Sequence, residues 1–236
     1  MEQLDGKHVG LAIRNALLSN LLMLGLYAID LLIVVMTILV SVDTLSGEIA
    51  SGTIQAVATK PVRRWELLAG KWLGFAGMLT LYIALMVLGI NGVTYFMSGI
   101  VVRHLVYGFA LMWMESMLLL CVTFCFGTTL STLTNGALAL GLHGLAFLGG
   151  WIEQVGALTK TPKAVGLGII ASIVMPSEAL WRRAAFEMQT PLATAGGVNP
   201  VFGGASIPSP LMVGYAAAYT AVFLAVAFRR LQKRDL

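Results

Sequence analysis

The strongest constraint on this chain is a series of five apolar stretches, each long enough to cross a lipid bilayer as a helix. A transmembrane helix needs about 20 mostly apolar residues, because its backbone polar groups must be satisfied within the segment. No part of the sequence alternates polar and apolar residues in roughly ten-residue units, which argues against a β-barrel. We therefore predict an all-α polytopic membrane protein. The predicted spans are residues 21–42, 67–97, 105–129, 137–158 and 211–228.

The composition excludes the main alternatives to a membrane protein. Of the 236 residues, 58% are hydrophobic and only 11% are charged, whereas an ordinary soluble domain has about 25% charged residues. A disordered chain needs the opposite balance, with low hydrophobicity and high charge. The two cysteines are too few for a disulfide scaffold.

Three segments outside these spans complete the predicted single transmembrane domain, residues 1–236. Residues 1–20 read as an amphipathic interfacial lead-in to the first span, because Val9, Ile13 and Leu17 repeat at helical spacing. Residues 46–71 form a loop between the first two spans, and residues 159–210 form a long segment before the last span. Within that segment, residues 164–175 are too short to span and stop at Pro176, which predicts a re-entrant or interfacial piece.

The distribution of Lys and Arg predicts the orientation in the membrane. Cytoplasmic loops carry an excess of both, and the loop at 46–71 and the C-terminus are both basic. Four spans separate them, so both lie on the cytoplasmic side of a multi-pass inner-membrane protein, and residues 159–210 lie outside. We expect Arg182 and Arg183 of that external segment to lie on a solvated helix face. The basic residues of the loop and the tail are Lys60, Arg63, Arg64, Lys71, Arg229, Arg230, Lys233 and Arg234.

The cytoplasmic loop predicts a short helix lying across the inner membrane surface. Ser46 can cap such a helix, and Glu48 lies favourably at its positive end. Pro61 stops it, and a second helix begins near Arg64. A basic helix of this kind can anchor to anionic lipid or dock on a partner protein, and its physical chemistry leaves both possibilities open.

The same loop carries a spaced pattern: Glu48-x-x-x-Gly52-Thr53, then Pro61-Val62-x-Arg64, then Lys71, with Arg63 as a second candidate for the basic position. This pattern resembles the signature loop of ABC-2-type transporter permeases. The resemblance implies that the loop holds the coupling helix, which docks on a separately encoded ATPase. It also implies six spans, with one ahead of residues 21–42 that we do not find here, and re-entrant helices in the external segment. Within the family, the pattern is most similar to membrane subunits of the nitrous-oxide-reductase maturation type.

The chain itself contains no nucleotide-binding motif. Gly70-Lys71 is followed by Trp72 rather than by Ser or Thr, so it is not a P-loop. We therefore expect a non-enzymatic subunit without its own cofactor, with ATP and Mg²⁺ bound by the partner ATPase. The resemblance implies a permease subunit, with export as the expected direction, in a homodimer or heterodimer of permease subunits. Membrane lipid is a further expected partner, an external protein could bind residues 159–210, and nucleic acid is not expected.

Polar residues inside spans are costly and are candidates for function. Glu115 in the third span and His143 in the fourth could line a substrate path, and Glu115 could also bind a proton or a cation. Alternatively, each could be a hydrogen-bonded packing residue. Asp30 and Asp43 are expected at the solvated ends of the first span. Small residues mark close helix contacts in membranes, which predicts contacts at Gly70, Gly74, Gly77, Gly141 and Gly144.

A stripe of sulfur-bearing side chains lies along the third span. Soft ligands of this kind suit Cu(I). However, the four residues spread over three turns of one helix, so they cannot close a coordination sphere, and we predict packing rather than a metal site. The stripe consists of Met114, Met117, Cys121 and Cys125.

Two other classes of function remain open at this point. One is a non-ABC channel or membrane assembly scaffold whose cytoplasmic loop anchors to lipid. The other is a membrane-embedded enzyme centred on Glu115 and His143. Co-purification of an ATPase distinguishes a transporter subunit from both.

Overall fold

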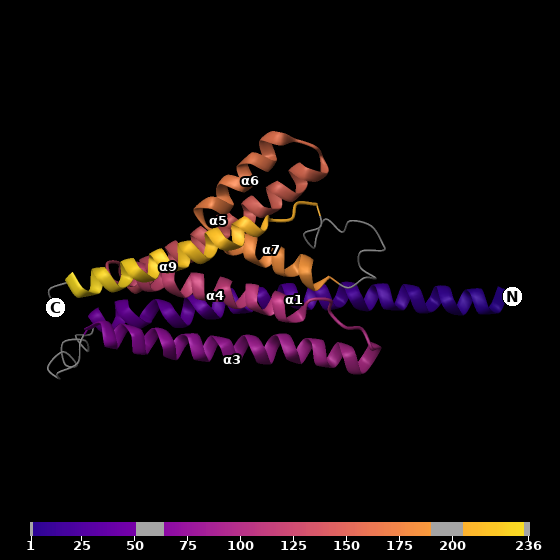
Figure 1. Ribbon diagram of the computed structural model, residues 1–236, viewed down its shortest axis with the longest axis horizontal. Helices are drawn as coiled ribbons and strands as arrows, with labels where there is room; N and C mark the ends of the chain where they lie inside the picture. Colours follow the sequence, from indigo (N-terminus) through magenta and orange to yellow (C-terminus); the bar gives the residue numbers. More distant parts are fainter. Residues whose placement is uncertain (1, 51–63, 190–204, 234–236) are drawn as a thin grey trace.

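The computed structural model describes residues 2–50, 64–189 and 205–233. These residues form helices and no strand, and the helices assemble into an elongated bundle (Figure 1). The helices are α1 (Glu2–Ala50), α3 (Arg64–Ser98), α4 (Leu105–Gly127), α5 (Thr132–Leu158), α6 (Pro162–Val174), α7 (Ser177–Met188) and α9 (Pro210–Lys233).

Five of these helices contain a segment long and apolar enough to cross a membrane, which confirms the predicted all-α polytopic fold. Each overlaps one predicted span, and the bounds differ by a few residues. The fold is therefore predictable at this level, because the length and hydropathy of a span are local properties of the sequence. The segments are Leu17–Thr44, Trp65–Ser98, Leu105–Gly127, Thr132–Leu158 and Pro210–Arg230.

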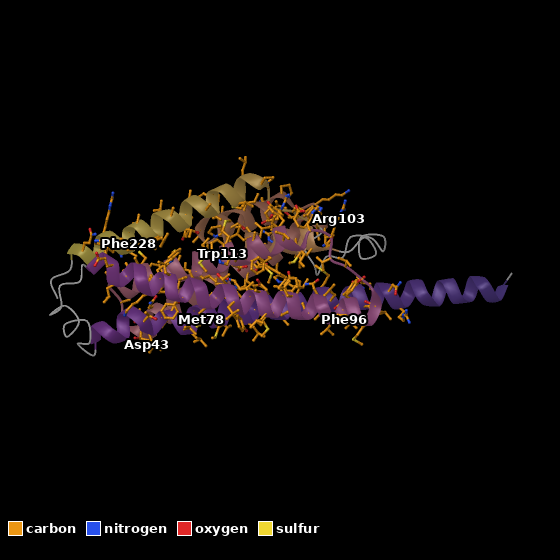
Figure 2. The ribbon with its side chains drawn as sticks, turned by 60° about the horizontal axis from the view of Figure 1, so that its bottom comes forward. Asp43, Met78, Phe96, Arg103, Trp113 and Phe228 are labelled. Carbon is orange, nitrogen blue, oxygen red and sulfur yellow. The ribbon has the colours of Figure 1, made fainter. Side chains whose placement is uncertain are left out.

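Helix α4 is the centre of the bundle, and most of its side chains are buried. It packs against α1, α7 and α9, while α3 lies along α1 and also contacts α4 and α9 (Figure 1). Asp43 of α1 and Phe228 of α9 lie at one end of the bundle, and Phe96 and Arg103 lie at the other (Figure 2). The end of α1 and the end of α9 therefore face the same side of the membrane, as the basic clusters predict.

Helix α1 runs without a break from Glu2 to Ala50 and differs from the prediction at both ends. Residues 2–20 are helical as expected, but they continue directly into the span rather than forming a separate lead-in. Ser46 does not cap a new helix, because residues 46–50 are the last part of α1. The physical reason is that residues 2–50 contain no proline, and a helix once formed adds residues cooperatively.

The segment before α9 contains a sharply bent helix pair, which is either a broken span or a re-entrant loop. Helices α6 and α7 are bent by 109° at a short break that contains Pro176. A break inside the membrane frees backbone carbonyls, and these need new donors in an apolar environment. Tyr215 and Tyr219 of α9 supply them, since their hydroxyls donate to the carbonyl oxygens of Ile173 at 2.7 Å and Val174 at 3.0 Å. Helix α9 thus caps the end of α6.

Glycines bring α5 and α6 close together, although they are not the glycines that the sequence pattern indicates. A Cβ added at Gly149 would meet Ala171, and one added at Gly168 would meet the Gly149 carbonyl oxygen and Glu153. By contrast, Gly141 and Gly144 have no atom of another element within 4 Å of a Cβ position. The same holds for Gly70, Gly74 and Gly77, so these five predicted contacts are wrong within this chain.

We predict that Gly168→Ala destabilises the protein, whereas Gly166→Ala on the same helix does not. The added methyl at residue 168 meets backbone atoms of α5, and overpacking of this kind costs about 1–3 kcal/mol. At residue 166 no atom lies within 4 Å of the added Cβ, so the expected effect is only a higher helix propensity of α6. Thermal unfolding of the purified variants in detergent measures the difference. A Gly168→Ala protein as stable as the wild type would contradict the close packing of α5 and α6.

Candidate functional site

In the sequence, the predicted coupling residues lie between α1 and α3 and in the adjoining ends of these two helices. Glu48 lies in the last turn of α1, and Arg64 is the first residue of α3. Gly52, Thr53, Pro61 and Arg63 lie outside the described residues, as do residues 51–59 of the predicted coupling helix.

Lys71 is the one residue of the signature whose side-chain contact is described. Its ammonium group donates to the carbonyl oxygen of Thr44 at 3.3 Å. This bond joins the first turns of α3 to the last turns of α1. The bond therefore connects α1 and α3, the two helices on either side of the signature loop, close to that loop.

Polar side chains connect this end of α1 to α4 and α5. Ser41 and Thr123 share a hydrogen bond of 2.7 Å, and Asn135 donates to the carbonyl oxygen of Thr123 at 3.0 Å. Asp43 is exposed, as predicted, and accepts a bond of 3.1 Å from Thr132. The inner ends of α1, α4 and α5 therefore form one hydrogen-bonded unit beside the signature loop.

Three carboxyl groups lie buried in the centre of the bundle. Asp30 is midway along the span Leu17–Thr44 and is only 5% exposed, so the prediction of a solvated position is wrong. Glu115 of α4 and Glu178 of α7 are 0% and 1% exposed. The Asp30 and Glu115 carboxyls lie next to each other, and Glu178 lies close to both. We call Asp30, Glu115 and Glu178 the carboxyl cluster.

His143 lies close to the start of α7 rather than opposite Glu115. Its Nδ1 shares a hydrogen bond of 3.0 Å with the hydroxyl of Ser177, the first residue of α7. Glu178 follows directly in the sequence. The two predicted pathway residues therefore meet different partners, and the N-terminal turn of α7 lies between them.

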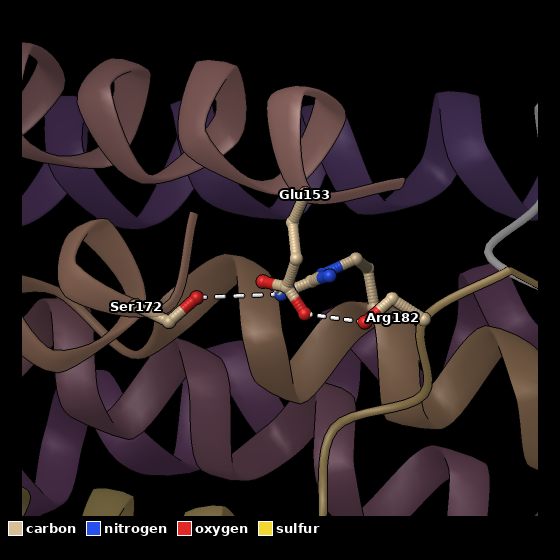
Figure 3. Close-up of polar contacts among 4 residues, drawn as sticks. Glu153, Ser172 and Arg182 are labelled. Carbon is tan, nitrogen blue, oxygen red and sulfur yellow. Dashed lines mark hydrogen bonds and ion pairs between the residues drawn. The ribbon is translucent and has the colours of Figure 1, made fainter. Parts of the chain in front are cut away.

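The Arg182 side chain is buried, which contradicts the predicted solvated face. It is 1% exposed, and its Nη2 donates to Glu153 Oε2 at 2.9 Å and to Ser172 Oγ at 3.3 Å (Figure 3). Ser206 donates to the other oxygen of Glu153 at 2.5 Å. A charge in the membrane interior must be paired, and this pair joins α5, α6, α7 and the residues before α9.

A second polar contact lies at the outer end of α7. Arg183 and His104 contact the two oxygens of Glu187 at 2.7 Å and 2.8 Å. Arg183 also donates to the carbonyl oxygen of Pro208 at 3.2 Å. The outer end of α7 is thereby joined to the connection between α3 and α4.

The sulfur stripe packs within the bundle. Cys121 and Cys125 are buried free thiols, and Cys121 Sγ accepts a bond of 3.3 Å from Trp72 Nε1. Within residues 2–50, 64–189 and 205–233, no group of three His, Cys, Asp or Glu side chains is arranged to hold a metal ion.

Sequence reasoning missed three of the buried charged residues: Glu153, Glu178 and Arg182. Glu153 is an acid inside the predicted span 137–158, and the cost of intramembrane charge is the signal that could have identified it. Glu178 and Arg182 are four residues apart, so they share one helix face after Pro176.

The sequence matches the family described as ABC-2 family transporter protein over residues 7–236. The chain belongs to this family. The match confirms the resemblance to this family that the signature loop shows. Together with the five apolar helices, it identifies the protein as a multi-pass membrane permease component of an ABC transporter. Among curated proteins and solved structures, none matches the chain.

We predict that Glu153→Gln strongly destabilises this permease, because it leaves the buried Arg182 guanidinium without a counter-charge. Breaking a buried ion pair in this way costs about 3–5 kcal/mol. Lys163→Gln is the matched control, since Lys163 is an exposed charge on the same hairpin. Thermal unfolding in detergent compares the two variants. Equal unfolding temperatures would show that the Arg182–Glu153 pair does not hold α7 in place.

Proposed function

We propose that this permease couples ATP hydrolysis in a separate ABC ATPase subunit to the movement of a substrate across the inner membrane, with export as the direction. The family match over residues 7–236 is the observation that carries the proposal. In this assignment the chain holds no nucleotide, and the ATPase binds ATP and Mg²⁺. The narrower resemblance to the nitrous-oxide-reductase maturation type stays a prediction.

The docking site in this proposal is the cytoplasmic loop between α1 and α3. Glu48, Gly52 and Thr53 set the geometry of the coupling helix, and Pro61 ends it. Arg63, Arg64 and Lys71 provide the basic elbow, and the bond from Lys71 to Thr44 supports its attachment to the bundle. A groove on the ATPase with acidic groups near this elbow would complement its charge.

Movement of the docked helix reaches the bundle through the polar unit at the inner ends of α1, α4 and α5. The Ser41–Thr123 and Asp43–Thr132 bonds join α1 to both neighbours, so a displacement of α1 also acts on α4 and α5. Closure of the ATPase subunits on ATP then shifts the population between inward-open and outward-open states.

A second permease subunit completes the pathway in this proposal, either as an identical copy or as a relative. Helices α3 and α9 present mostly exposed apolar side chains on the outside of this bundle. Gly70, Gly74 and Gly77 of α3 have room around them, and small residues let helices of different subunits approach closely.

Co-purification tests the function directly. We expect the tagged permease, extracted from its native membrane, to bring down a subunit that hydrolyses ATP, identified by mass spectrometry and by phosphate release. A channel or scaffold would bring down none. Chemical cross-linking before extraction retains a weakly bound ATPase, so its absence after cross-linking would overturn the proposal.

We predict that Glu48→Gln leaves the ATPase bound and active but uncouples it from the permease. The measurement is hydrogen–deuterium exchange of residues 162–188 with and without Mg-ATP and vanadate. ATP-dependent exchange in this hairpin should disappear in Glu48→Gln and persist in Glu66→Gln, which changes an exposed acid in the first turn of α3. The same ATP response in Glu48→Gln as in the wild type would exclude the coupling role.

A further inference from the structure

The carboxyl cluster is incomplete as a hydrogen-bonded site. Its three members come from α1, α4 and α7 and lie in the bundle interior. Both oxygens of Glu115 and one oxygen each of Asp30 and Glu178 are buried without a hydrogen-bond partner among the described residues. Buried carboxylate oxygens normally accept hydrogen bonds, because losing water without a replacement is costly. The cluster therefore needs something that the protein side chains do not supply.

The contact between Asp30 and Glu115 identifies what is needed. The two carboxyls lie next to each other, and neither oxygen of Glu115 has a hydrogen-bond donor among the described residues. Two ionised carboxylates cannot bond to each other, since neither has a proton to donate. One proton placed between them converts the contact into an O–H···O bond and removes one of the two negative charges. Two carboxyl groups at one buried site share a proton for this reason.

Glu178 lies beside these two carboxyls but is in a different environment. It lies in the first turn of α7, where the helix dipole favours an anion. A Cβ placed on Gly150 would lie 3.4 Å from Glu178 Oε1 and 3.3 Å from Arg182 Nε. Neither atom has a hydrogen-bond partner in the structure. The first turns of α7 therefore pack closely against Gly150 of α5, and an acceptor of Glu178 and a donor of Arg182 stay unsatisfied there.

Arg182 lies on the Glu178 side of the cluster, and its Nη2 is bonded to Glu153 and Ser172. In the described part of the chain, no basic side chain acts on Asp30 or Glu115. The titratable groups of the described residues that surround the cluster are Tyr27 on α1, His143 and Glu153 on α5, and Arg182 on α7. The charged residues of α3 lie in its first two turns, at Arg64, Glu66 and Lys71.

A metal ion does not fit the cluster as well as a proton does. Within the described ranges, no group of three His, Cys, Asp or Glu side chains is arranged to coordinate a metal ion. The carboxyl cluster is therefore not such a group. A proton needs only the two facing oxygens of Asp30 and Glu115.

We propose that Asp30 and Glu115 form a proton-binding site at the centre of the permease, with one proton shared between them and the Glu178 carboxyl beside it. The proton comes from water, and its binding converts one carboxylate to the carboxylic acid. Since Glu178 is carried by α7, a movement of α7 shifts this third carboxyl relative to the proton.

Infrared spectroscopy tests the site without reference to substrate or ATPase. The protein is purified with its accompanying subunits in a maltoside detergent, which has no ester carbonyl. At neutral pH we expect the C=O stretch of a buried carboxylic acid, shifted in D₂O. Glu115→Gln and Asp30→Asn each supply an amide donor in place of the proton, so each should abolish the band completely. Glu66→Gln, an exposed acid on α3, is the control and should leave it unchanged.

The outcomes are distinct. Loss of the band in either single variant supports the site, so one variant suffices if the other fails to fold. Absence of the band from the wild type, or its survival in both variants, overturns the proposal. Failure to find an ATPase partner would not alter the band, so the two proposals fail separately.

Discussion

The arrangement of the outer half of this permease depends on the pairing of Arg182 with Glu153. A guanidinium inside an apolar bundle is tolerated where its charge is matched by an acid. Glu153 belongs to α5, and Ser172 of α6 accepts a second bond from the same nitrogen. The pair therefore holds α7 against the α5–α6 hairpin. Tyr215 and Tyr219 complete the arrangement by bonding the carbonyls that the break after α6 leaves free.

Insertion of α7 creates the chemistry at the centre of the bundle. It brings Ser177 to His143 and Glu178 to the side of Asp30 and Glu115. The Arg182–Glu153 contact is paired and bonded, whereas the carboxyl cluster lacks donors. The first has the character of a structural support, and the second has the character of a binding site. Both depend on the same twelve-residue helix.

The parts of this structure that the sequence predicts are local, and the parts that it misses are long-range. Span lengths and the break at Pro176 depend on neighbouring residues, so the five spans and the hairpin are predicted correctly. The burial of Asp30 and Arg182 depends on α7 entering the bundle, and nothing near either residue in the sequence indicates this. Likewise, hydropathy does not distinguish one face of α5 from another. The sequence therefore predicts a helix contact at Gly141, whereas the structure has the contact at Gly149. The signature loop identifies the family because its spacing is local too.

Helix α1 connects the two sites that this permease is proposed to use. It carries Glu48 at the coupling end and Asp30 at the proton site, 18 residues apart on one unbroken helix, which is about 27 Å. A helix without proline or a break transmits displacement along its axis with little bending. Movement of the coupling end would therefore shift Asp30 relative to Glu115, whose helix is bonded to α1 by Ser41 and Thr123 close to that end. The separation of the two carboxyls decides whether they can share a proton, so the same helix that receives the push from the ATPase would also control the protonation of the bundle centre.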